Sequence, residues 1–396
     1  MAVRASICAV VLALLCGLAS ECSAKRNIAF YAFKGGADGA YAYGGLVQDA
    51  SGDFYGTTGN GGSGGNCAGG CGTLFKLTAG GTHAVIHNFT GGMDGNWPNA
   101  DLVSDAAGNI FGSTVIGNSS TGSIFKLATD GAFSVLHTFG QIDGSHPGVR
   151  LAAADNGDIY GTTGGGGAHG LGTIFKLASG GTLTTLYDFR DEEDGRWPYG
   201  GIVRDANGNL YGGTQNGGDP KCNCGTLFEL DHTGTFSVLH TFKGKHDGSQ
   251  PLGPLTIAND GITGATLYGG AKCQCGVIFH IGADNSFSVL YAFPSRKKGS
   301  RPSGALIADD GGNLYGTTQA GGGCKAIDLG CGTVFRLAPD GVLTTLHAFK
   351  AGSDGYGPVS ALVLSGANLY GTVPRGGDLD CNGTGCGMVF RVKNTD

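Results

Sequence analysis

A unit of about 50 to 56 residues recurs seven times along the chain, a period typical of the blades of a β-propeller. Each copy carries an aromatic–Gly pair, followed by a Phe that ends a Gly-Thr-aliphatic-Phe run in the best copies. The first six copies then carry Leu-His-x-Phe or Leu-Tyr-x-Phe, with Ile in place of Leu in the first. The aromatic–Gly pairs begin at Tyr55, Phe111, Tyr160, Tyr211, Tyr268, Tyr315 and Tyr370. This repeat limits the fold strongly, because one unit cannot bury its apolar face alone and must stack against its neighbours.

Each unit divides into four short strands, which we name a to d. In the sixth unit they are expected at 306–308, 314–318, 332–337 and 343–349, separated by Gly, Asp and Asn turns. Alternating β-branched and aromatic residues between such turns are typical of antiparallel hairpins. The sequence therefore predicts an all-β protein, a seven-bladed β-propeller of four-stranded blades, in a single domain over residues 25–396.

The two ends of the repeat region complete one blade between them. The seventh unit stops after its strand c, at Phe390-Arg391-Val392, and a matching strand d stands at residues 28–33. An open array of repeats would not need this permutation. We therefore expect residues 28–33 to complete the last blade and to close the ring.

Composition excludes several other classes of protein. Glycine supplies 79 of the 396 residues, and each glycine in a helix costs about 1 kcal/mol relative to alanine, so a helical bundle is excluded. Glycine shows no Gly-X-Y period, which excludes collagen. The 25 basic and 31 acidic residues do not form the concentrated basic face that nucleic-acid binding requires, so we expect no nucleic-acid partner.

The first 24 residues have the order of a secretory signal peptide. Arg4 precedes an apolar run over residues 5–19, and Cys22-Ser23-Ala24 provides a small-residue cleavage site. Cleavage after Ala24 removes three of the 13 cysteines and leaves an even 10. We expect a secreted or cell-surface monomer with no membrane span after cleavage.

The repeats resemble the Gloeo/Verruco (GloVer) tandem-repeat family over nearly all of residues 28–392. The resemblance is carried by Leu314-Tyr315-Gly316-Thr317-Thr318, the following Gly321-Gly322 region, Gly332-Thr333-Val334-Phe335-Arg336-Leu337 and Leu346-His347-Ala348-Phe349. It implies a bacterial-type secreted or surface repeat protein. It implies no known activity and supplies no catalytic residues.

Ten cysteines fall as five local pairs in the connections between strands b and c. The pairs are Cys67/Cys71, Cys222/Cys224, Cys273/Cys275, Cys324/Cys331 and Cys381/Cys386. The second and third units lack both members of the pair, which favours disulfides in an oxidising compartment. The two Cys-x-Cys segments leave local bonds, cross-blade pairing and a four-cysteine zinc site as alternatives.

Two other recurring residues have structural interpretations. The histidines of Leu-His-x-Phe are His87, His137, His240 and His347, with Tyr in three other copies. One such residue per outer strand cannot converge on a metal, so we expect hydrogen-bonded structural residues and no metal or cofactor. The recurring Asp-Gly between strands d and a is interpreted as a turn.

The residue before the recurring Pro of the d–a connection varies between copies. It is Tyr41 (aligned, without the Pro), Trp97, His146, Trp197, Gln250, Arg301 and Gly357. The b–c and d–a connections of a propeller emerge on one face, and loops on a rigid scaffold are where binding usually occurs. We therefore predict that Tyr41, Trp97, His146, Trp197, Gln250 and Arg301 contact a ligand; the alternative is that both tryptophans cover blade edges.

One connection, residues 188–194, is acidic. Asp191, Glu192 and Glu193 are the weak catalytic candidates, because paired carboxylates could serve a glycoside hydrolase or a lyase; a solvated loop is the simpler interpretation. Arg296, Lys297, Lys298 and Arg301 form a basic counterpart two blades further on.

The preferred hypothesis from the sequence is a non-catalytic binding module for an extracellular glycan or protein. The alternatives are a carbohydrate-active enzyme that uses loop 188–194 and a purely structural envelope protein.

Overall fold

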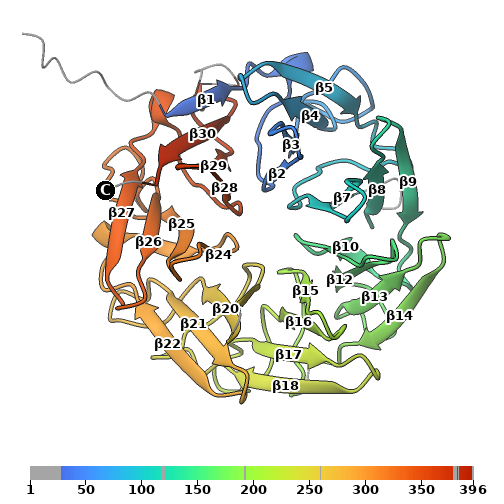
Figure 1. Cartoon of the computed structure of the whole chain (residues 1–396). Helices are drawn as coiled ribbons and strands as arrows, with labels where there is room; N and C mark the ends of the chain where they lie inside the picture. The colour runs from blue at the N-terminus through green and yellow to red at the C-terminus, as the bar shows by residue number, and fades with distance from the viewer. Residues whose placement is uncertain are drawn as a thin grey trace, which may run out of the picture.

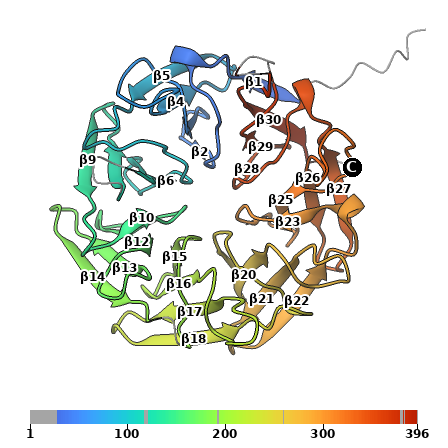
Figure 2. The same cartoon turned by 180° about the vertical axis from the view of Figure 1, so that it is seen from behind.

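The computed structural model describes residues 28–116, 121–190, 193–258, 260–377, 381 and 383–394. These residues form seven antiparallel sheets arranged around a central channel (Figure 1). Seen from either side, the short strands a lie nearest the axis and the strands d lie at the rim (Figure 2). The prediction of a seven-bladed propeller is therefore confirmed.

The blades are numbered along the chain, and each contains strands a to d in order. Blade 1 contains β2 (Val47–Gln48), β3 (Phe54–Thr58), β4 (Thr73–Leu77) and β5 (His83–Asn88). Blade 2 contains β6 (Val103–Ser104), β7 (Ile110–Thr114), β8 (Ser123–Leu127) and β9 (Phe133–Thr138). Blade 3 contains β11 (Ala152–Ala153), β12 (Ile159–Gly165), β13 (Thr173–Leu177) and β14 (Leu183–Asp188), with β10 (Ser145–Pro147) also paired to β12.

The same order continues around the ring. Blade 4 contains β15 (Ile202–Arg204), β16 (Leu210–Gly213), β17 (Thr226–Leu230) and β18 (Phe236–Thr241). Blade 5 contains β19 (Thr256–Ala258), β20 (Gly261–Thr266), β21 (Val277–Gly282) and β22 (Phe287–Ala292). Blade 6 contains β24 (Ile307–Ala308), β25 (Leu314–Ala320), β26 (Thr333–Leu337) and β27 (Leu343–Ala348), with β23 (Ser300–Pro302) paired to β25.

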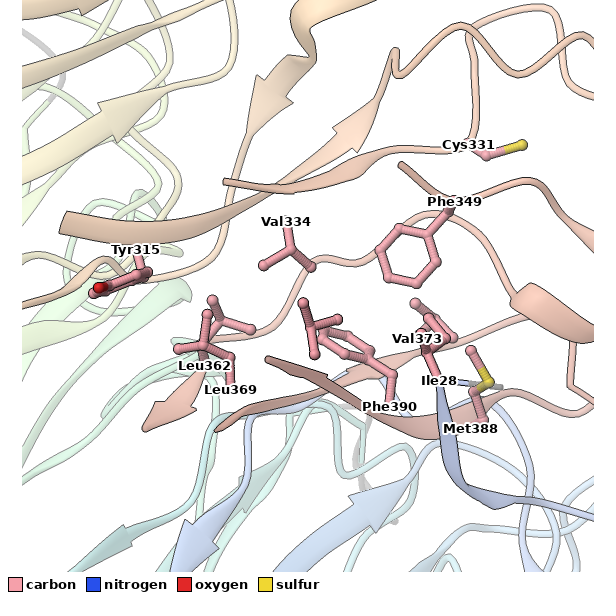
Figure 3. Packing of buried hydrophobic residues seen from close by; sticks show 11 residues of the cluster. Ile28, Tyr315, Cys331, Val334, Phe349, Leu362, Leu369, Val373, Met388 and Phe390 are labelled. Carbon is pink, nitrogen blue, oxygen red and sulfur yellow. The ribbon is translucent and has the colours of Figure 1, made fainter. Parts of the chain in front are cut away.

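Blade 7 is composed of both ends of the repeat region. It contains β28 (Val363–Ser365), β29 (Asn368–Val373), β30 (Met388–Lys393) and, as its strand d, β1 (Ala29–Ala32). β1 pairs antiparallel with β30 in the register Ala32↔Met388. Ile28 packs with Met388 and Val373 in the apolar cluster between blades 6 and 7 (Figure 3). The N-terminal strand thus closes the ring, as the permuted repeat predicts.

The apolar core is divided among the seven contacts between consecutive blades, which we call junctions. At junction 1/2, for example, Leu74 and Phe89 of blade 1 are buried against Leu102 and Phe125 of blade 2. Each of the seven buried clusters joins two neighbouring blades in this way. Burial of apolar surface between blades, rather than within one blade, therefore holds the ring together.

The glycine of the aromatic–Gly pair is required by packing. A Cβ on Gly56 would lie 2.5 Å from the Phe75 ring and 2.7 Å from Leu46, so strand b must leave this space to strands a and c. In blade 5 the glycine with these contacts is Gly264, which faces Phe279 and Leu255. The sequence assignment of Tyr268-Gly269 to this position is therefore wrong: Tyr268 lies beyond the end of β20, where it forms a bridge with Ser249.

Three short 3-10 helices lie in d–a connections: η1 (Gly36–Asp38), η2 (Arg296–Lys298) and η3 (Gly352–Asp354). Among the described residues, no helix has the length and apolar character needed to cross a membrane.

Candidate ligand-binding face

The seven residues at the variable position before Pro, which we call the ring positions, share one backbone conformation. All are in the left-handed region, with φ of 60° at Tyr41, 57° at Trp97, 55° at His146, 60° at Trp197, 57° at Gln250, 57° at Arg301 and 71° at Gly357. An L-residue in this region costs roughly 1–2 kcal/mol. Only Gly357 avoids this cost, so six of the seven positions hold a side chain at the expense of backbone strain.

A hydrogen bond to the preceding blade holds each ring position in place. The backbone N–H donates to the carbonyl of the residue just before the strand c glycine of that blade, at 3.1 Å from Trp97 to Cys71 and 2.9 Å from Arg301 to Cys275. The same bond joins Tyr41 to Cys386, His146 to Thr121, Trp197 to Leu171, Gln250 to Cys224 and Gly357 to Cys331. The d–a and b–c connections therefore meet on one side of the ring, which we call the loop face.

The two tryptophans lie in different surroundings on this face. Trp97 is 41% exposed, and its Nε1 donates to Asn60 Oδ1 of blade 1 at 3.1 Å. Trp197 is half-buried, and the Arg196 guanidinium lies 5.0 Å from its ring centroid. Both tryptophans are thus positioned by polar neighbours rather than enclosed in an apolar core.

The other predicted contact residues also lie at the loop face and are half-buried. His146 Nδ1 is 3.2 Å from Ser145 Oγ, and the Arg301 guanidinium lies 5.3 Å from the centroid of the Tyr268 ring. Tyr41 packs against the apolar cluster of junction 7/1. The structure places these residues around a rim, one per blade, and does not bring them into a single cluster.

The recurring His or Tyr of strand d and the recurring Asp of the d–a connection bind one another. At junction 1/2, His87 Nε2 is 3.1 Å from Asp94 Oδ2, which also accepts the Thr90 N–H at 2.9 Å. We call this arrangement the Asp lock. Equivalent side-chain pairs are Tyr31–Asp38, His137–Asp143, Tyr187–Asp194, His240–Asp247 and His347–Asp354, at 2.6 to 3.2 Å.

Ring stacking adds to the lock. His87 stacks on Phe133 of blade 2 with ring centroids 3.6 Å apart. Burial, with the hydrogen bond to Asp194, raises the pKa of Tyr187 to about 12, so this hydroxyl remains a donor at neutral pH. These residues have structural roles, as predicted. That the His or Tyr motif and the Asp-Gly motif are hydrogen-bond partners was not predicted from the sequence.

The acidic loop is only partly described. Asp191 and Glu192 lie outside the described residues. Glu193 is exposed, whereas Asp188 accepts the Ala168 N–H at 2.8 Å and Asp194 belongs to an Asp lock. An open cavity of about 780 Å³ lies between this loop and the b–c connection of blade 4.

The ten cysteines are placed as five local disulfides, Cys67–Cys71, Cys222–Cys224, Cys273–Cys275, Cys324–Cys331 and Cys381–Cys386. Their Cα–Cα separations are 5.2 to 5.5 Å, within the range of disulfide-linked residues. All five lie in b–c connections and stiffen the loop face.

A buried carboxylate that was not predicted from the sequence lies beside the central channel, a space of about 620 Å³ lined by strands a. Asp101 Oδ1 accepts the Gly45 N–H at 2.5 Å. Burial raises the pKa of Asp101, opposed by Arg150 and by the N–H groups of Gly45 and Ala361. Asp101 therefore connects blade 2 to blades 1 and 7. A comparison of the repeats could have identified Asp101, because the residues at the same position in blades 1 and 7 are the uncharged Gly45 and Ala361.

The chain belongs to the family of the Gloeobacter/Verrucomicrobia repeat, whose model matches residues 64–274 and 255–396. No curated protein matches it in sequence. A structure of streptogramin B lyase is similar at 17% identity, with a TM-score of 0.61 over 90% of this chain and 94% of that one.

A second similar structure is the extracellular domain of a "putative hybrid two component system" from B. thetaiotaomicron. It has 12% identity and a TM-score of 0.58, and the match covers 91% of this chain and 39% of that one. At these identities, both likenesses establish the propeller fold alone.

Proposed function

We propose that this protein is a secreted or cell-surface, non-catalytic binding module that holds an extracellular glycan against the loop face. The observation that supports the proposal is the set of ring positions. The backbone is the same in all seven blades, yet the side chains are different and six of them are held in a strained conformation. Strain that the surrounding structure maintains is typical of functional sites.

The chemistry of the side chains favours a sugar. Trp97 and Trp197 offer broad ring surfaces beside amide and guanidinium groups, through Asn60 and Arg196. An aromatic surface with hydrogen-bonding neighbours can stack on the apolar face of a sugar and bind its hydroxyls at the same time. The signal-peptide-like segment and the five local cysteine pairs support export to an oxidising compartment, where such a ligand is found.

The proposal is tested by a glycan array probed with the purified protein, run beside a screen for polysaccharide degradation. Binding to a defined glycan without product release supports the binding module. Degradation that is lost in Glu193→Gln would instead support the carbohydrate-active enzyme. Absence of both activities would favour the structural envelope protein and contradict the proposal.

A further inference from the structure

Junction 5/6 keeps the strand d tyrosine but lacks the aspartate of the Asp lock and the backbone N–H that donates to it. Lys298 stands where the other junctions have the aspartate, and Pro294 replaces the residue whose N–H donates to it. Tyr291, which aligns with His87, forms no hydrogen bond to a carboxylate within the described chain. One junction has therefore lost the internal anion that the other six retain.

Positive charge accumulates at this junction without an internal partner. Arg296, Lys297 and Lys298 are exposed in η2, and the half-buried Arg301 follows three residues later. None of these four forms an ion pair with another described residue. The neighbouring loops add four exposed lysines, Lys243, Lys245, Lys272 and Lys325. The acidic residues of these loops are Asp247, which belongs to an Asp lock, and the exposed Asp328.

A small pocket lies among these charges. Its volume is about 200 Å³, and its lining includes Tyr268, Gln274, Arg296, Ser300 and Arg301. It is smaller than typical drug-sized sites of about 300–1,000 Å³, which suits one charged group or one sugar ring. Three loops build it: the b–c connections of blades 5 and 6 and the d–a connection between them.

Two strained residues line this pocket. Gln274 has φ of 54° and Arg301 has φ of 57°. The equivalent of Gln274 in blade 4 is Asn223, whose left-handed backbone is explained locally because its Oδ1 accepts the Gly217 N–H at 2.5 Å. The amide of Gln274 forms no such bond in the described chain, so its donor and acceptor are available to a ligand.

We propose that this pocket binds the carboxylate or sulfate group of an acidic polysaccharide, an inference that rests on the proposed glycan-binding function and names its ligand class. The two guanidinium groups can bind a planar or tetrahedral anion through paired N–H donors. The contact with the Tyr268 ring holds the Arg301 guanidinium in place before a ligand binds. The rest of the lining includes Leu329 and the Cys273–Cys275 disulfide, so the charged groups stand beside an apolar wall.

The test measures binding of the full-length secreted protein to polygalacturonate, chondroitin sulfate and neutral dextran by isothermal titration at two salt concentrations. We expect binding to one or both acidic polymers that weakens with salt, and the two polymers distinguish carboxylate from sulfate. Arg296→Gln with Arg301→Gln should weaken it about tenfold or more. The charge-matched control is Lys34→Gln with Lys350→Gln, in the loops of two Asp-locked junctions, and should change it less than about twofold.

A second variant separates binding from folding. Gln274→Gly removes the amide but relieves the left-handed backbone, so affinity should fall several-fold while the melting temperature stays the same or rises. Affinity unchanged in both pocket variants, or an equal loss in the lysine control, would overturn the proposal. Equal binding to poly-glutamate with the same arginine dependence would assign the pocket to acidic peptides instead.

The outcome also separates this inference from the function on which it rests. Binding to neutral glycans alone would contradict the acidic ligand and leave the binding module intact. No glycan binding of any kind would contradict both.

Discussion

At junction 1/2, Asp94 accepts hydrogen bonds from Thr90 and lies against His87. At junction 5/6, Lys298 occupies the position of the aspartate, and Pro294, which has no N–H, occupies the position of Thr90. The loop shape survives this exchange. The unlocked loop contains η2 (Arg296–Lys298), and the locked loops of junctions 7/1 and 6/7 contain the equivalent η1 and η3. The shape of the loop therefore does not depend on the aspartate, whose role is to accept hydrogen bonds and to supply a negative charge. Junction 5/6 lacks that charge and presents an exposed positive surface instead.

The largest effect is expected at junction 7/1, whose lock belongs to the strand that closes the ring. Deleting residues 28–34 removes β1 and Tyr31, so β30 gains an unpaired edge and Asp38 loses its partner. Such edges promote aggregation. Calorimetry and light scattering should show a much lower melting temperature and aggregation. A cooperative transition within a few degrees of wild type would contradict the closure.

Next in size is the contrast between a lock and its substitute. Asp94→Ala removes the acceptor of the Thr90 N–H and the hydrogen-bond partner of the His87 ring, and should lower the free energy of unfolding by about 1–3 kcal/mol. Lys298→Ala at the unlocked junction should change it by less than about 0.5 kcal/mol. Urea denaturation measures both, and equal effects would show that the lock is not a distinct stabilising device.

Transplanting the lock should have a smaller effect on stability. Pro294→Lys with Lys298→Asp supplies a carboxylate that can accept from the Tyr291 hydroxyl and a backbone N–H that can donate to that carboxylate, and should raise the free energy of unfolding by about 1 kcal/mol. The two substitutions together also lower the net charge of this loop by one beside the 200 Å³ pocket, so binding of an acidic polysaccharide should weaken. Stability that falls together with affinity would indicate that loop 294–299 cannot accept the lock.

The pH dependence of one lock offers the smallest measurable contrast. Burial would raise the pKa of Asp247, but hydrogen bonds from His240 and from the backbone, including the Lys243 N–H, outweigh it and hold the pKa below its usual value. A lowered folded-state pKa adds stability that is fully present above the unfolded value of about 3.9 and is lost as pH falls toward the folded one. Asp247→Asn should therefore destabilise the protein at pH 7 more than at pH 3; an equal effect at both would contradict this.

The ring itself could be predicted from the sequence. The number of repeat copies gives the number of blades, and the position of the last strand d at the N-terminal end indicates how the ring closes. Packing explains where the prediction failed: Gly264 in blade 5 lacks an aromatic neighbour in sequence, and only its contacts with Phe279 and Leu255 identify it. The variable residue before Pro could be found from alignment of the copies, but its positive φ could not, because Trp and Arg carry no sequence signal for the left-handed region. Likewise the Asp lock joins two motifs that lie six or seven residues apart in the sequence.

The proposed function requires that the ring positions hold side chains for a ligand rather than for packing. Glycine is the decisive replacement, because it removes the side chain and also relieves the backbone at φ of 57° and 60°. Trp97→Gly and Trp197→Gly should each weaken glycan binding about tenfold or more while the melting temperature stays within a few degrees of wild type. Ile142→Ala, at a 90% exposed residue of the same face, is the matched control and should change neither. Binding that is unchanged in both tryptophan variants, with a large fall in melting temperature, would assign these residues to packing and contradict the account.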